Sequence, residues 1–248
     1  MKAMILAAGR GTRLRPLTDN RPKALVEVAG RTLLEIVLSR LRGFGIREVI
    51  INVHHLAGMI VDYLKANENF GMRIEVSREE VLLDTGGGLK KAAHFFLEDS
   101  SRLDDPFILH NVDVISTIDL GRMVQLHTER HALATLAVQD RETSRYLLFD
   151  EQLQLCGRRL GRDQAPELVR DSQPGQALAF SGIHVISPQI FSMMTEEGVF
   201  SIIASYLRLA ARGEKILAFR ADKYYWRDLG RPENVAQAEQ DLKNRVFV

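Results

Sequence analysis

Glycines and cationic residues gather directly after the first apolar segment of this chain, in a pattern suited to holding phosphate. Residues 6 to 25 read LAAGRGTRLRPLTDNRPKAL, with two glycines, four arginines and one lysine. Glycine leaves backbone N–H groups accessible to phosphate oxygens, and guanidinium groups bind those oxygens bidentately. The stretch therefore indicates a phosphate-binding loop, for which a solvated basic turn is the alternative interpretation.

The spacing within this loop excludes two common phosphate sites. No G-K-[ST] is present, so it is not a Walker loop, and Leu14 stands where a dinucleotide fingerprint requires its third glycine. A dinucleotide site also seldom uses Arg10, Arg13 and Arg15, because a helix N-terminus alone serves its pyrophosphate. The arginines suit a triphosphate, whose charge must be held and then increases on a departing pyrophosphate.

The elements expected to position this loop alternate between apolar strands and amphipathic helices. Strands are predicted at residues 3–8, 48–53, 73–77 and 106–113, and helices at residues 32–45 and 56–67. This alternation predicts βαβ units, a mainly parallel sheet and right-handed crossovers. Ligands of such sheets bind beyond the carboxyl ends of the strands. We therefore expect the loop starting at Gly9 and the strand end at Asp113 to lie on one edge.

The second half of the chain is less regular. Strands are expected at residues 133–140, 145–151 and 178–187, a helix at 200–214, extended chain at 215–230 and a closing helix at 231–244. The polar segment 156–176 contains three glycines and two prolines, so we expect an irregular or mobile connection that serves as a lid or a linker. We find no internal repeat, and one domain spanning residues 1–248 is the economical interpretation.

The amino-acid composition indicates which kinds of partner and which compartment this domain is expected to have. The chain has 248 residues, of which 46% are hydrophobic, enough to form a large core. Its net charge of +1 provides no global field for nucleic acid or an anionic membrane, so neither is expected as a partner. The single cysteine, Cys156, excludes an internal disulfide and fits a reducing compartment. The first apolar run is shorter than a signal peptide requires. We expect a soluble, cytoplasmic protein.

Five motifs give the chain a family resemblance. They are L-A-A-G-x-G-T-R-L-x-P-L-T-x-x-x-P-K from Leu6 to Lys23, E-x-x-x-x-D-T-G-G-G from Glu79 to Gly88, N-x-D from Asn111 to Asp113, F-S-G-I from Phe180 to Ile183, and W-x-D-x-G from Trp226 to Gly230. In order and spacing they resemble the sugar 1-phosphate nucleotidyltransferases, and among these the short bacterial N-acetylmuramate 1-phosphate uridylyltransferases. The resemblance covers nearly the whole chain.

This resemblance implies a fold, a reaction, and which part of the chain binds which substrate. The fold would be a Rossmann-like, three-layer α/β nucleotidyltransferase fold with a mainly parallel, mixed central sheet. The enzyme would join a nucleoside triphosphate to a sugar 1-phosphate in a magnesium-dependent reaction, giving a nucleotide sugar and pyrophosphate. Residues of about 1–140 would bind the nucleotide, and residues of about 141–248 would bind the sugar and end in the closing helix.

The resemblance also implies roles for individual residues. The nucleotide-binding set is Ala7, Ala8, Gly9, Gly11, Thr12, Arg13, Glu79, Thr85 and Gly86, with residues 85–88 in a loop that opens a helix over 89–96. Arg13 would stabilise the departing pyrophosphate, and Lys23 would lie on the α-phosphate or the sugar phosphate. The magnesium ligands would be Asp113 and Asp228, as hard carboxylate oxygens are required. The sugar-binding set is Asn111, Ser181 and Gly182.

The base and the sugar stay open. A carboxylate at Glu79 can accept from uracil or thymine N3–H and equally from guanine, and residues 78–80 also fit a solvated charge run. The resemblance favours UTP, with GTP and a mannose- or heptose-type 1-phosphate as the alternative. Val112 replaces a glycine usual before the metal aspartate, and Asp84 replaces a glycine common in larger relatives. Val112 would narrow the sugar site or point to the core.

Two other classes of function are considered. A non-catalytic nucleotide sensor would have no need to retain Arg13, Lys23 and both aspartates, and a nicotinamide-dependent dehydrogenase is disfavoured by Leu14 and the arginines. His54, His55 and His110 lack zinc-ligand spacing and are taken as structural or as neighbours that support the site residues. The expected partners are therefore a nucleoside triphosphate and a sugar 1-phosphate, bound by a monomer or a small homo-oligomer.

Overall fold

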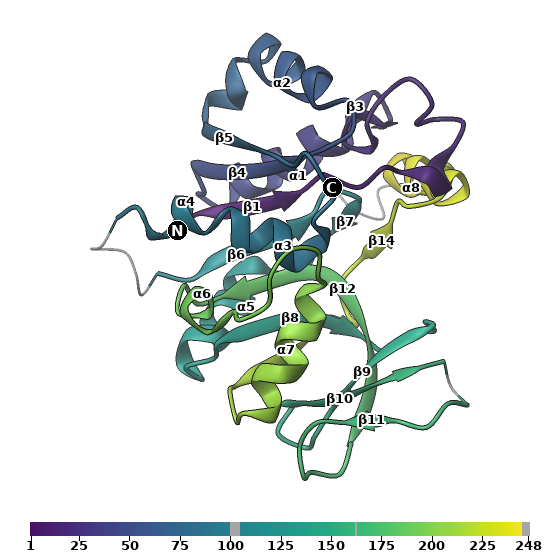
Figure 1. The fold of residues 1–248 in the computed structure, drawn as a ribbon. Coiled ribbons are helices and arrows are strands. Elements are labelled where there is room, and N and C mark those ends of the chain that lie inside the picture. Colours follow the sequence, from purple (N-terminus) through teal and green to yellow (C-terminus); the bar gives the residue numbers. More distant parts are fainter. Residues whose placement is uncertain (100–104, 162, 245–248) are drawn as a thin grey trace. The chain divides into compact units, whose positions relative to one another are not determined.

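The computed structural model describes residues 1–99, 105–161 and 163–244 and has an α/β fold (Figure 1). The single domain predicted over residues 1–248 therefore extends beyond the described residues, because residues 100–104, 162 and 245–248 are not among them. The chain forms two compact units from interleaved segments. The first comprises Met1–Leu83, Leu109–Ile118 and Tyr224–Val248, and the second comprises Asp84–Ile108 and Asp119–Lys223. The predicted assignment of nucleotide binding to about residues 1–140 and of sugar binding to about residues 141–248 stays a prediction.

The first unit is built on parallel strands joined by helices. Its elements are β1 (Ala3–Leu6), β2 (Glu27–Val28), β3 (Arg31–Thr32), α1 (Leu33–Gly43), β4 (Glu48–Val53), α2 (Ala57–Ala66), β5 (Arg73–Arg78), the end of β6 (Phe107–Asn111), β7 (Val114–Ser116), β14 (Trp226–Asp228) and α8 (Pro232–Lys243). The strand order β6-β1-β4-β5 has parallel β1–β4 and β4–β5 pairs, as the predicted βαβ units require.

The second unit has a mixed sheet. Its elements are α3 (Asp84–Lys91), α4 (Ala93–Leu97), α5 (Leu120–Glu129), β8 (Ala134–Gln139), β9 (Arg145–Phe149), β10 (Leu155–Leu160), β11 (Glu167–Leu168), β12 (Gln176–Ile186), α6 (Ile190–Met193), α7 (Ile202–Ala211) and β13 (Ile216–Arg220). The pairs β10–β11, β9–β10, β9–β12 and β8–β12 are antiparallel, and β8–β13 is parallel. The predicted α/β class with a mixed sheet is confirmed.

Each unit has an apolar core made by the expected faces. Helix α1 buries Leu33, Leu34, Val37, Leu38 and Leu41, which recur at helical spacing, and its N-cap Thr32 accepts from the Glu35 N–H at 3.0 Å. In the second unit, the Phe96 ring stacks on Phe107 with centroids 3.9 Å apart. Among the described residues, no helix combines the length and the apolarity needed to cross a membrane.

Two expectations about local structure are wrong. The segment 156–176 is not wholly irregular, because β10 and β11 pair in it, and its residue 162 lies outside the described ones. The strand pattern is weak in the sequence because only the first half of β10 is buried. Leu160 at its end and both residues of the edge strand β11 are exposed. The helix expected at 89–96 is divided into α3 and α4, and α3 begins earlier, at Asp84.

Candidate active site

The predicted phosphate loop leaves the carboxyl end of β1 and turns through glycine. Ala7 and Ala8 are only 4% and 5% exposed, so small side chains are needed there, whereas Gly9 and Arg10 are exposed. Gly11 has φ +66°, and a Cβ at that position would lie 2.9 Å from Thr18 Cγ2. The Thr18 hydroxyl donates to the Gly11 carbonyl oxygen at 2.8 Å. Glycine is therefore required at position 11 by both backbone conformation and space.

Lys23 and Asp113 form an ion pair inside the first unit. Lys23 begins a short 3-10 helix after Pro22, and its Nζ donates to Asp113 Oδ2. The two side chains are 12% and 13% exposed, so both charges are largely withdrawn from water. Two residues predicted on separate motifs thus lie in direct contact.

Asp113 and Asp228 are brought together by a two-stranded ribbon. Strands β7 and β14 are antiparallel, with Asp228 opposite Val114, and the Leu229 N–H donates to the Asp113 carbonyl oxygen at 2.7 Å. The two aspartates, far apart in sequence, therefore occupy neighbouring positions at the end of the ribbon. Asp228 Oδ1 also accepts from the Gly230 N–H at 2.7 Å, which orients its carboxylate.

Arg13 reaches the same end of this ribbon. A Cβ added at Gly230 would lie 2.6 Å from Asp228 Oδ1 and 2.9 Å from Arg13 Nη2. The Asp228 carboxylate and the Arg13 guanidinium therefore lie next to each other beside Gly230. The absence of a side chain at Gly230 leaves room for both groups. The first unit therefore gathers two cations, Arg13 and Lys23, with two carboxylates.

These carboxylates fit a magnesium ion. Within the part of the chain that the structure describes, no three His, Cys, Asp or Glu side chains come together as metal ligands. Magnesium is commonly held by one or two carboxylates, with substrate phosphates and water completing its octahedron. Asp113 and Asp228 supply that number, and the Lys23 ammonium already holds a positive charge at Asp113 Oδ2. The donor set therefore suits a cation that arrives with a phosphate substrate.

Asn52 is a buried residue of the site that the sequence analysis missed. Its Oδ1 accepts from the Ala7 N–H at 2.8 Å, and its Nδ2 donates to Glu79 Oε1 at 2.7 Å. Glu79 Oε2 accepts from the Leu83 N–H at 2.9 Å. Glu79 is 4% exposed, so the alternative of a solvated charge run is wrong for this residue. The available signal was that Asn52 interrupts the apolar run that follows Glu48 in EVIINV, and a buried polar residue needs hydrogen-bond partners.

Arg40 is a second residue that the sequence analysis missed. Its guanidinium donates to the Ser116 hydroxyl at 2.6 Å and to the Ile118 carbonyl oxygen, so it holds the strand that follows Asp113. Burial lowers the pKa of Arg40 to about 10. His110 is fully buried beside it, and burial, with the nearby Arg40 charge, lowers the pKa of His110 to about 3. His110 is therefore neutral, which agrees with a structural role.

The residues expected beside the metal aspartate lie at the end of β6. Asn111 is the last residue of that strand and is partly exposed. Val112 is 2% exposed, and its N–H donates to the Leu6 carbonyl oxygen at 3.1 Å. Of the two alternatives for Val112, the buried side chain agrees with the one that points to the core.

The glycine-rich motif of the second unit is helical, which corrects the prediction of a loop. Thr85 and Gly86 lie in the first turn of α3, where the Gly86 N–H donates to the Phe200 carbonyl oxygen at 2.9 Å. Thr85 Oγ1 accepts from the Ile202 N–H at 3.0 Å. A Cβ at Gly86 would overlap the Phe200 ring, so glycine at position 86 permits the close packing of α3 against Phe200.

Ser181 and Gly182 lie inside β12 of the second unit. Gly182 has φ +75°, and the register between β12 and β8 shifts between Phe180 and His184, which marks a β-bulge. Ser181 is fully buried. The motif F-S-G-I therefore forms a bulged strand whose glycine allows the irregular backbone.

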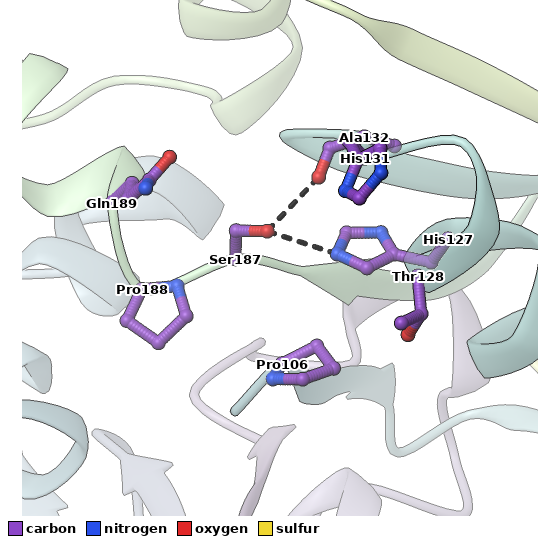
Figure 2. A pocket seen from close by; sticks show the side chains of 8 residues that line it. All are labelled: Pro106, His127, Thr128, His131, Ala132, Ser187, Pro188 and Gln189. Atoms are coloured by element: carbon purple, nitrogen blue, oxygen red, sulfur yellow. Dashed lines mark hydrogen bonds between the residues drawn. The ribbon is translucent and has the colours of Figure 1, made fainter. Parts of the chain in front are cut away.

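A cavity in the second unit contains a serine–histidine contact (Figure 2). His127 Nε2 lies 3.0 Å from Ser187 Oγ, but the Ser187 hydroxyl donates to the Ala132 carbonyl oxygen at 2.9 Å. Nε2 must therefore be the donor, and Nδ1 accepts from the Thr135 hydroxyl at 3.1 Å. A histidine that donates to a serine cannot take its proton, so this pair is no nucleophile.

Comparison with known proteins identifies the family. The family model described as Nucleotidyl transferase matches residues 2–245. The chain belongs to this nucleotidyltransferase family. An N-acetylmuramate alpha-1-phosphate uridylyltransferase of Caulobacter vibrioides is 34% identical over 97% of this chain and 96% of its own length. A mannose-1-phosphate guanyltransferase of Yarrowia lipolytica is 28% identical over 94% of this chain and 62% of its own length.

A solved structure shares the fold of this nucleotidyltransferase. HddC from Yersinia pseudotuberculosis, complexed with GMP-PN, superposes with a TM-score of 0.76 over 97% of this chain and 99% of its own, at 21% identity. The predicted Rossmann-like nucleotidyltransferase fold and the predicted family are thereby confirmed. The chain is a sugar-phosphate nucleotidyltransferase, and its relatives include enzymes for both uridylyl and guanylyl transfer.

Proposed function

We propose that this enzyme transfers a uridylyl group from UTP to a sugar 1-phosphate, with magnesium as its metal, in the cytoplasm. The observation that supports this most is the gathering of Arg13, Lys23, Asp113 and Asp228 at one end of the β7–β14 ribbon. A site that only stores nucleotide gains nothing from two carboxylates beside two cations, whereas phosphoryl chemistry uses both.

The reaction is a direct displacement at phosphorus. A phosphate oxygen of the sugar 1-phosphate forms a bond to the α-phosphorus, and the bond to the bridging oxygen of pyrophosphate breaks, so that oxygen leaves with the electron pair. No covalent enzyme intermediate is required, and the residues act by positioning and charge neutralisation. Arg13 would hold the charge that grows on pyrophosphate, and Lys23 would move from Asp113 to the phosphates of the substrates.

The cation would be held by Asp113 and Asp228. Magnesium bound there would offset the negative charge of the phosphates that must approach each other. If the cation takes Asp113 Oδ2, the Lys23 ammonium that now contacts this oxygen would exchange it for phosphate oxygens. Its release toward the phosphates would then coincide with substrate binding.

The nucleoside would lie on the backbone of Ala7, Ala8 and Gly9, with Gly11, Thr12 and Arg13 on the outer phosphates. Glu79 would accept from the N3–H of uracil. In support, its carboxylate is held with both oxygens as acceptors, so it suits a base edge that donates. Thr85 and Gly86 are proposed to complete nucleotide binding, and Asn111, Ser181 and Gly182 to bind the sugar.

Guanylyl transfer is the second candidate. A carboxylate at Glu79 accepts equally well from guanine N1–H, and one relative is a mannose-1-phosphate guanyltransferase. UTP is favoured because the uridylyltransferase of Caulobacter vibrioides matches this chain over almost its full length. Its N-acetylmuramate 1-phosphate is accordingly the first sugar to test.

The test is pyrophosphate release, measured for UTP, dTTP, GTP, CTP and ATP against a panel of sugar 1-phosphates, with magnesium and with EDTA. We expect a magnesium-dependent signal with UTP. Asp228→Asn should abolish it, whereas Asp62→Asn, a matched change on the exposed side of α2 in the same unit, should leave it unchanged. A signal confined to GTP would replace UTP, and full activity of Asp228→Asn would refute the metal assignment.

A further inference from the structure

The buried contacts of Asn52 connect three segments of the first unit. Asn52 is the fifth residue of β4, where it is paired with Leu6 on one side and Ser77 on the other. Its side chain reaches the Ala7 N–H, directly after β1, and Glu79, directly after β5. The carboxyl ends of three adjacent strands are thus tied together at the level where the phosphate loop begins.

The hydrogen bonds from Asn52 to Ala7 and to Glu79, together called the Asn52 bridge, each have a fixed donor and acceptor. The Ala7 N–H can only donate, so the Asn52 oxygen faces it, and the Asn52 NH₂ group faces Glu79. The Leu83 N–H can also only donate, so both Glu79 oxygens must act as acceptors. Asn52 and Glu79 are 3% and 4% exposed, so water cannot replace a lost partner cheaply.

We propose that Asn52 is the positioning residue that couples the base-contacting Glu79 to the backbone of the phosphate loop at Ala7. The inference rests on the proposed function, in which Ala7 and Glu79 both contact the nucleoside. Asn52 itself needs no contact with the substrate. Its planar amide group fixes the position of the Ala7 N–H and the rotamer of Glu79. The proposed nucleoside contacts of Ala7 and of Glu79 therefore both depend on Asn52.

The direction of these bonds predicts which substitutions fail. In Glu79→Gln, one side-chain oxygen becomes an NH₂ group, so one of the two donors that face residue 79 meets another donor. In Asn52→Asp, a second carboxylate lies against Glu79 at the distance where the atoms are now 2.7 Å apart. Glu79→Gln therefore buries two hydrogen-bond donors against each other, and Asn52→Asp buries two carboxylates against each other. Both arrangements are unfavourable without water.

The double substitution restores the pattern. With Asn52→Asp and Glu79→Gln in one chain, the new carboxylate accepts from the Ala7 N–H and from the new amide NH₂, and the amide oxygen accepts from the Leu83 N–H. The shape and the number of hydrogen bonds are kept, and the negative charge moves from position 79 to position 52. A role in general stability alone would weaken tripolyphosphate binding together with nucleotide binding, so the comparison of these two ligands separates it from a role in positioning.

The experiment compares affinities for UTP, GTP and inorganic tripolyphosphate by calorimetry, with magnesium, on the full chain. We expect Asn52→Asp and Glu79→Gln each to weaken nucleotide binding by roughly tenfold or more while tripolyphosphate binding changes little. The double variant should recover most of the loss. Thr32→Ala is the matched control, since it removes the N-cap of α1 in the same unit and lowers stability without touching the bridge.

The outcomes separate the inference from the proposed function. Nucleotide binding by the unsubstituted protein, weakened in both single variants and recovered in the double variant, supports the inference. If the unsubstituted protein binds nucleotide but the double variant is no better than the singles, or Thr32→Ala weakens binding as much, the inference is overturned. If the unsubstituted protein binds no nucleotide, the proposed function fails, and the inference falls with it.

Discussion

The ion pair between Lys23 and Asp113 predicts that removing the lysine makes the stability of the first unit depend on magnesium. In Lys23→Met, the Asp113 carboxylate, 13% exposed, loses the cation that lies on it. Breaking a largely buried pair typically costs about 3–5 kcal/mol, because the remaining charge is uncompensated. The partial exposure of both side chains points to the lower end, about 3 kcal/mol.

Urea unfolding measures this effect in the unit concerned. Trp226, the only tryptophan of the chain, lies on β14 two residues before Asp228, so its fluorescence reports on the first unit. With EDTA, we expect the midpoint of Lys23→Met to fall by roughly 1 M, for a slope of about 3 kcal/mol per molar urea. Magnesium should restore much of the loss, because a cation that binds only the folded protein stabilises it.

The control for this prediction is a pair outside the site. Arg73→Met breaks the Arg73–Glu48 pair of the same unit, whose arginine side chain is 53% exposed, and should change stability by less than about 1 kcal/mol without any response to magnesium. A Lys23→Met variant whose midpoint is the same in EDTA and in millimolar magnesium would refute the assignment of Asp113 as a metal ligand.

Three further outcomes follow from local geometry. Gly86→Ala should destabilise the second unit by about 1–3 kcal/mol in thermal unfolding, because its Cβ would overlap the Phe200 ring, and an unchanged midpoint would contradict this packing. Gly58→Ala, in α2 with nothing within 4 Å of the added Cβ, should stabilise by about 0.5–1 kcal/mol. Burial lowers the pKa of His127 to about 4, so the unfolded chain takes up this proton first, and stability should fall between pH 6.5 and 4. Imidazole nitrogen NMR should show neutral His127, protonated on Nε2, at pH 6, and ordinary titration near pH 6.5 would refute the burial argument.

The sequence by itself determined the class of this protein. Apolar runs of strand length alternating with amphipathic helices are local patterns, and they predicted β1, β4, β5, α1 and α2 within a few residues of their observed ends. The motif from Leu6 to Lys23 identified the family by its resemblance to the family's signature, because that signature lies along one continuous stretch of chain. Features that depend on neighbours in sequence were therefore readable from sequence.

Only the tertiary structure decided which distant residues meet. The neighbouring positions of Asp113 and Asp228 depend on the antiparallel register of β7 and β14, and no local pattern fixes a register between segments so far apart. Asn52 was missed for the same reason, since its role lies in hydrogen bonds to Ala7 and Glu79 across three strands. Local chemistry names the groups that a site can use, whereas long-range pairing, which depends on the packed whole, decides how they are arranged.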